Sequence, residues 1–161
     1  MCDDNEADKL AIDLVVSGFF SAFNNKDGKL ADLQCLNDIF VPGGVTVKTC
    51  GEPPSVCSLA DFVASRHKLL NDGELDDFSE EELWERTDIF GSIAQRLCLY
   101  KKSGVLSGKK FETKGMKSIQ LVNTETGWKI SSVAWDDERA GVAVPALPGG
   151  MARDNPDGDL V

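Results

Sequence analysis

The second half of the chain is a series of apolar, strand-forming segments separated by short turn sequences. The segments that predict strands cover residues 84–90, 93–100, 111–122 and 128–135. Turn sequences, mostly of small and polar residues, lie between them at 101–104, 107–109 and 123–127. Strands joined by such short turns must run antiparallel, so this half of the chain predicts an antiparallel sheet.

The first half of the chain carries mainly helical patterns. Apolar residues recur at helical spacing and predict an amphipathic helix over residues 7–24. A shorter helix is expected over 29–38, with three inward-facing leucines, Leu30, Leu33 and Leu36. Residues 45–49 alternate and are rich in β-branched side chains, which predicts a strand. Ser58, followed three residues later by Asp61, is typical of the start of a third helix.

Three N-terminal helices followed by antiparallel strands define an α+β fold. We expect the helices to pack inside a strongly curved, mixed or antiparallel sheet, whose concave face would form a pocket. At 161 residues the chain is long enough for one domain. We expect a flexible N-terminus over 1–6, a folded domain over 7–138, and a disordered tail rich in Gly, Pro, Ala and Asp over 139–161.

The charge and cysteine content argue against several classes of function. Acidic residues outnumber basic residues by 27 to 17, so nucleic acids and anionic membranes are disfavoured as partners. Five cysteines without CxxC spacing and a single histidine predict no metal site, and nothing in the sequence indicates a cofactor. We expect reduced cysteines in a cytoplasmic protein, with a Cys50–Cys57 disulfide as the alternative.

Nine acidic residues are concentrated between positions 72 and 88, with one basic residue among them. Their spacing does not match that of a calcium-binding loop, so we expect a solvated loop and the start of a strand. His67 lies between two basic residues on the third helix, and we expect it to be a solvated residue on the helix face. Neither feature predicts a catalytic centre.

The order of these elements, together with several local strings, resembles the NTF2-like superfamily, also called the SnoaL-like or cystatin-like cone fold. The strings that carry the resemblance lie at residues 19–28, 90–94, 115–121 and 127–135. The last of these, Gly-Trp-Lys-Ile-Ser-Ser-Val-Ala-Trp, is the most familiar. The resemblance covers about residues 7–138 and is closest to uncharacterised bacterial members. It implies a homodimer, and a fold that hosts both enzymes and binding proteins.

Key catalytic residues of the superfamily's enzymes are missing from the matching positions. The tyrosine of ketosteroid isomerases would fall at Phe19 or Phe20, and their aspartate base near Lys48 or Thr49. Dehydratases of the scytalone type need paired histidines and several tyrosines, whereas this chain has one of each. Gln95 stands where relatives often have histidine, and glutamine performs no acid–base chemistry near neutral pH.

An arrangement like that of epoxide hydrolases leaves three weak catalytic candidates, Arg86, Asp88 and Arg96. Arg86 and Asp88 lie two residues apart and therefore share a strand face. The favoured interpretation of these residues is a cross-strand ion pair on the exposed face of the sheet.

We therefore expect a homodimer whose cone binds a small, largely apolar ligand. The residues expected to contact the ligand are Phe19, Phe23, Phe40, Trp84, Gln95, Tyr100, Ser118, Gln120 and Trp135. Strand 116–122 leaves open which of its two faces looks into the cone. The alternatives are an isomerase, cyclase or hydrolase of the SnoaL or ketosteroid-isomerase type, and a module that binds another protein.

Overall fold

The computed structural model describes residues 2–146 of the chain. The helical elements in this range are α1 (Cys2–Ser21), the short 3-10 turn η1 (Lys26–Gly28), α2 (Leu36–Ile39) and α3 (Leu59–Asn71). The strands are β1 (Phe40–Lys48), β2 (Ser55–Ser58), β3 (Leu75–Phe90), β4 (Ile93–Leu106), β5 (Lys109–Thr124) and β6 (Gly127–Asp137). The predicted α+β class is confirmed.

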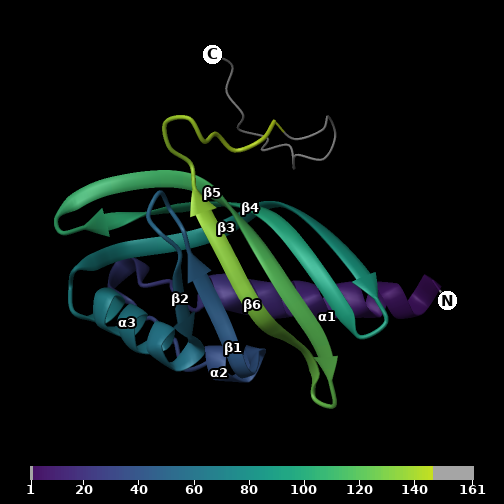
Figure 1. Ribbon diagram of the computed structural model, residues 1–161. Helices are drawn as coiled ribbons and strands as arrows, with labels where there is room; N and C mark the ends of the chain where they lie inside the picture. The colour runs from purple at the N-terminus through teal and green to yellow at the C-terminus, as the bar shows by residue number, and fades with distance from the viewer. Residues whose placement is uncertain (1, 147–161) are drawn as a thin grey trace.

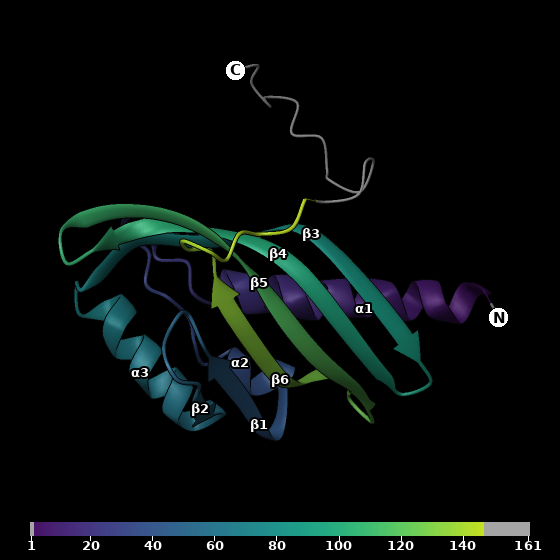
Figure 2. The ribbon, with the colours of Figure 1, turned by 45° about the horizontal axis from the view of Figure 1, so that its top comes forward.

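The six strands form one mixed sheet in the order β2-β1-β6-β5-β4-β3. Only β1 and β6 pair in parallel, and every other neighbouring pair is antiparallel, as short connections require. Long strands β3, β4 and β5 bend across the molecule, with α1 beneath their concave side (Figure 1). The view in Figure 2 shows α3 at the same end of the molecule as the β4–β5 hairpin.

Helix α1 fills the concave side of the sheet with apolar side chains. Ile12, Val16 and Phe19 recur at helical spacing and are almost completely buried against the sheet. On the sheet, Trp128 is also buried, and its indole N–H donates to the Asp8 carboxylate at 2.8 Å. This contact ties the start of β6 to α1, because a buried indole N–H needs an acceptor.

The predicted second helix is wrong over most of its length. Only Leu36–Ile39 is helical, and the segment before it is irregular, with a turn at Gln34 and Cys35. Ala31 and Leu33, two residues apart, are both buried, whereas Leu30 is 74% exposed. This alternation is the period of extended backbone, so the leucine spacing suggested a helix that does not form. The third helix begins as predicted, with the Ser58 side chain accepting a hydrogen bond from the Asp61 amide.

Two boundaries differ from the expected ones because strands and helices extend further than their apolar segments. Helix α1 starts at Cys2, five residues before the expected start at residue 7. Strand β3 starts at Leu75, so most of the acid-rich segment is strand rather than solvated loop. The expected turn at 101–104 lies inside β4.

The expected disordered tail falls partly within the described region. Residues 147–161 lie outside it, whereas Arg139 and Val142 form an isolated antiparallel bridge. The four cysteines whose state is described, Cys35, Cys50, Cys57 and Cys98, are free, so the alternative of a Cys50–Cys57 disulfide is wrong. No helix within residues 2–146 is long and apolar enough to cross a membrane.

Candidate functional site

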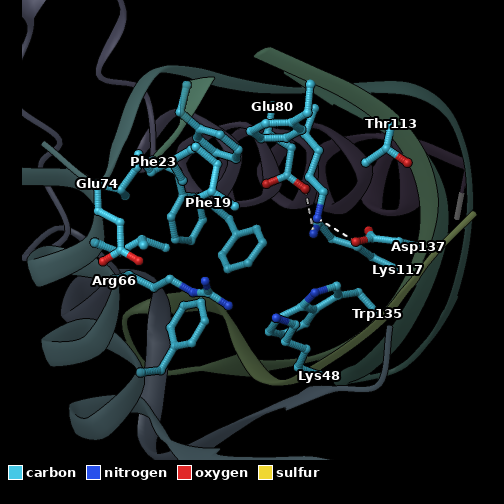
Figure 3. A pocket seen from close by; sticks show the side chains of 18 residues that line it. Phe19, Phe23, Lys48, Arg66, Glu74, Glu80, Thr113, Lys117, Trp135 and Asp137 are labelled. Carbon is cyan, nitrogen blue, oxygen red and sulfur yellow. Dashed lines mark hydrogen bonds and ion pairs between the residues drawn. The ribbon is translucent and has the colours of Figure 1, made fainter. Parts of the chain in front are cut away.

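A cavity of about 470 Å³ opens at the end of the cone beside α3. Its walls come from the end of α1, one face of α3, the start of β3 and the ends of β1, β4 and β6 that meet the start of β5 (Figure 3). This volume lies within the range of small-molecule sites in proteins. The sheet's curvature creates the space, and the length of β3, β4 and β5 beyond α1 keeps it from being filled.

Aromatic rings form a continuous apolar wall on one side of the cavity. The ring centroids of Phe19 and Phe23 are 5.2 Å apart, and those of Phe23 and Phe62 are 5.9 Å apart. Phe62 in turn meets Trp135 edge to face at 5.9 Å. Such edge-to-face contacts are the favoured geometry of aromatic pairs, so the wall is rigid and apolar.

A buried ion pair crosses the floor of the cavity. The Lys117 Nζ lies 2.7 Å from Glu80 Oε1, and the two side chains are only 5% and 7% exposed. The same ammonium lies 4.0 Å from the ring centroid of Tyr100 and 5.2 Å from that of Trp135. Carboxylate and aromatic faces together compensate for the hydration that this cation loses.

A second charged group, Asp137, is held at the end of β6. One of its oxygens accepts a hydrogen bond from the Lys102 ammonium at 2.8 Å, and the other accepts from the Tyr100 hydroxyl. Burial alone would raise the pKa of Asp137, but these hydrogen bonds outweigh it and hold the pKa below its usual value. Burial and the same carboxylate raise the pKa of Tyr100, so its hydroxyl stays protonated.

Arg66 reaches into the cavity from α3 and contacts mainly aromatic faces. Its guanidinium carbon lies 5.2 Å from the Phe62 ring centroid and 5.9 Å from that of Trp135. Figure 3 shows this side chain pointing toward the middle of the cavity. Burial lowers the pKa of Arg66, but an arginine side chain remains charged in proteins.

Three of the nine predicted ligand contacts line this cavity, namely Phe19, Phe23 and Trp135. Phe40 and Tyr100 are buried behind the lining, where Phe40 packs on Phe19 with centroids 6.0 Å apart. The remaining four, Trp84, Gln95, Ser118 and Gln120, do not line the cavity.

The open question about strand 116–122 is settled by the burial of β5. Lys117, Ile119 and Leu121 are buried and face the helices, so Ser118 and Gln120 are exposed on the opposite face of the sheet. The sequence suggested either orientation because both faces carry apolar residues.

The weak catalytic candidates do not come together. Arg86 and Asp88 are exposed, with Arg86 Nε 3.7 Å from Asp88 Oδ2, and the amide of Gln95 also donates to Asp88. Arg96 pairs with Thr87 across the ladder and faces the opposite side, where it is buried. The favoured interpretation, a cross-strand ion pair on the exposed face, is therefore wrong in two respects. Arg86 and Asp88 pair on that face but along one strand, β3, and Arg96 is buried on the other face.

Arg96 is the centre of an internal charge network between the sheet and α1. Its guanidinium donates to Glu82 at 2.5 and 2.9 Å and to Asp13 at 2.6 Å, while Lys9 bridges Asp13 and Glu85. None of these residues lines the cavity. The network fixes α1 on the sheet and is structural.

Several charged residues of the cavity were not anticipated from the sequence, namely Arg66, Glu80, Lys102, Lys117 and Asp137. Cross-strand pairing gave no signal for these residues, because neither ion pair joins neighbouring strands. Glu80 and Lys117 lie on β3 and β5, and Lys102 and Asp137 lie on β4 and β6. Within residues 2–146, no group of three or more His, Cys, Asp or Glu side chains is arranged to hold a metal ion. His67 is exposed, as expected.

These features define an open cone with a charged, aromatic cavity, and solved structures share the fold. The chain matches an NTF2-like superfamily protein from Salmonella enterica serovar Typhimurium with a TM-score of 0.70 and 12% identity, over 91% of this chain and 98% of the other. A protein with a cystatin-like fold from Caulobacter vibrioides matches with a TM-score of 0.65 and 14% identity, over 84% and 92%.

A Streptomyces avermitilis protein of the NTF2-like family, named as a candidate dehydratase, matches with a TM-score of 0.65 and 14% identity, over 83% of this chain and 97% of the other. The sequence itself matches no protein-family model and no curated protein. At these identities the likeness establishes the fold alone. The chain has the NTF2-like, cystatin-like fold that its sequence predicted.

Proposed function

We propose that the protein binds a small, largely apolar molecule in the cavity beside α3. The observation that carries this proposal is an open cavity of about 470 Å³ behind a wall of four aromatic rings. Proteins fill their interiors densely, so a space of this size between well-packed elements favours an occupant from outside.

The chemistry of the cavity favours binding over catalysis. A general base works best with a pKa near the working pH, whereas the pKa of Asp137 is held low by Lys102 and Tyr100. Glu80 is occupied by Lys117. The isomerase, cyclase or hydrolase alternative would need one of these carboxylates to be released when a substrate enters.

The test of this proposal uses a neutral fluorescent probe, N-phenyl-1-naphthylamine, whose emission rises in apolar sites. Thr113→Trp fills the cavity mouth, because Thr113 points into it from β5 (Figure 3). Glu112→Trp is the matched control, because the neighbouring strand residue is exposed and lies on the other face. We expect Thr113→Trp to abolish binding and Glu112→Trp to retain it. Equal binding by the two folded variants would refute the proposal.

The outer face of the sheet favours a second role, contact with another copy of the chain. Phe90 and Ile93 are 83% and 59% exposed at the β3–β4 hairpin, and the exposed Leu97 lies on the same face. Exposed apolar groups that gather on one face mark interaction surfaces. We propose a homodimer through this face, and Ile93→Lys should convert it to a monomer in light scattering. An unchanged mass would refute this interface.

A further inference from the structure

Arg66 differs from the other internal charges of the cavity in having no counterion. Lys117 is paired with Glu80 at 2.7 Å, and Lys102 with Asp137 at 2.8 Å. Among the residues whose side chains the structure describes, no carboxylate lies within ion-pair distance of the Arg66 guanidinium. Its close contacts are the faces of two aromatic rings, which attract a cation but accept few hydrogen bonds.

The remaining charges of the lining leave this end of the cavity positive. Lys48 and Glu74 are both exposed at the mouth, and neither forms an ion pair with another described side chain. With the two internal pairs neutral, the lining carries four cationic and three anionic groups. The chain as a whole has a net charge of −10, so most of its surface repels an anion. The cavity lining differs in carrying a positive net charge.

We propose that the ligand is a small organic acid, with an oxyanion that binds Arg66 and an apolar body that lies against the phenylalanines of the cavity lining. This inference rests on the proposed function, and it adds the chemical class of the ligand. The guanidinium has five N–H donors in a planar fork, which matches the two oxygens of a carboxylate or two of a sulfonate. Phe62 and Trp135 hold that fork in place by stacking.

The lining also offers apolar side chains to the body of such a ligand. Phe78 and Phe111 line the cavity with ring centroids 6.4 Å apart, and Leu106 is part of the same lining. A neutral ligand would leave the guanidinium without an acceptor, and a cationic one would be repelled by it. The arrangement therefore selects for an anion at one end and hydrocarbon at the other.

The experiment compares two probes that share one ring system. 1-Anilinonaphthalene-8-sulfonate carries a sulfonate, and N-phenyl-1-naphthylamine lacks it. Dissociation constants for both are measured on the full chain and on Arg66→Met, which keeps an apolar side chain but removes the charge. Because charge-assisted hydrogen bonds in partly buried sites contribute strongly, we expect the sulfonate to lose roughly tenfold to hundredfold in affinity and the neutral probe little. Arg66→Lys should restore part of the preference.

Lys110→Gln is the control, because it removes one positive charge from an exposed residue outside the cavity. The ratio of the two dissociation constants should not change in this variant. The inference is overturned if the ratio in Arg66→Met equals that of the unmodified protein while both probes still depend on an open cavity. If Thr113→Trp leaves the binding of both probes intact, the proposed function fails instead, so the two failures are distinct.

Discussion

Replacing Lys117 with methionine should destabilise the fold by about 3–5 kcal/mol. The substitution keeps an apolar stem of similar length but leaves the Glu80 carboxylate buried without its cation, since both side chains are at most 7% exposed. Removing one member of a buried pair is costly because the remaining charge has lost its hydration and no longer has a counterion.

The structure allows the magnitude to be worked out. The charged atoms are 2.7 Å apart, which at an effective dielectric constant of about 20 corresponds to an attraction of ~6 kcal/mol. Several kcal/mol of that attraction offset the desolvation of the two groups. The methionine variant loses the whole attraction of ~6 kcal/mol, but it no longer has to desolvate the Lys117 ammonium. The net loss of stability is therefore smaller than the attraction, and it is still several kcal/mol because Glu80 remains buried.

Urea unfolding of Lys117→Met, Glu80→Gln and the double variant measures the coupling directly. The double variant should be more stable than the sum of the two single losses predicts, by about 2 kcal/mol or more. Lys101 and Glu112 are the matched control, because they pair at 3.7 Å while 36% and 62% exposed. Their coupling should be below about 1 kcal/mol. Equal coupling in both pairs would refute the reasoning, because burial would then contribute nothing.

Three further predictions concern acid stability, backbone packing and thiol reactivity. Asp13, Glu85 and Asp137 have pKa values below their ordinary values in the folded protein. The stability that they contribute should be complete above about pH 5 and should decline as the pH falls through their folded-state pKa values. In urea unfolding measured at a series of pH values, Asp137→Asn should make this decline less steep. Gly115→Ala should lower the free energy of unfolding by about 1–3 kcal/mol, because the added Cβ would overlap the backbone oxygen of Asp136 on the adjacent strand β6. Thermal or urea unfolding measures this loss, and an unchanged midpoint would contradict the close approach of the two strands at Gly115. Burial raises the pKa of the Cys98 thiol and shields it, so an alkylating reagent monitored by mass spectrometry should modify it only on unfolding; rapid modification of the native protein would exclude this packing.

The fold could be predicted because its main signals are local and agree with one another. The turn after Thr124, the cap at Ser58 and the apolar period of α1 each depend on neighbours within a few residues. The helix expected over 29–38 did not form over most of its length. Ala31 and Leu33 are buried in the core two residues apart, and the leucine spacing does not show this burial.

The candidate site could be predicted only in its apolar part. Phe19, Phe23 and Trp135 line the cavity because large aromatic residues are found in cores and pockets alike. The charged part was missed because a buried lysine has the same sequence appearance as an exposed one. Only the register of β5 tells that Lys117 faces inward and Ser118 outward.

The acid-rich segment and the unpaired Arg66 have a common explanation in the arrangement of the sheet. On strand β3, Glu82 forms an ion pair with Arg96 of β4, and Glu80 forms one with Lys117 of β5. These inward-facing carboxylates are therefore already paired. Arg66 instead belongs to α3, on the far side of the cavity, and no strand brings a carboxylate to it. A net negative chain can thus keep one internal cation, Arg66, available to an acid that enters the cavity.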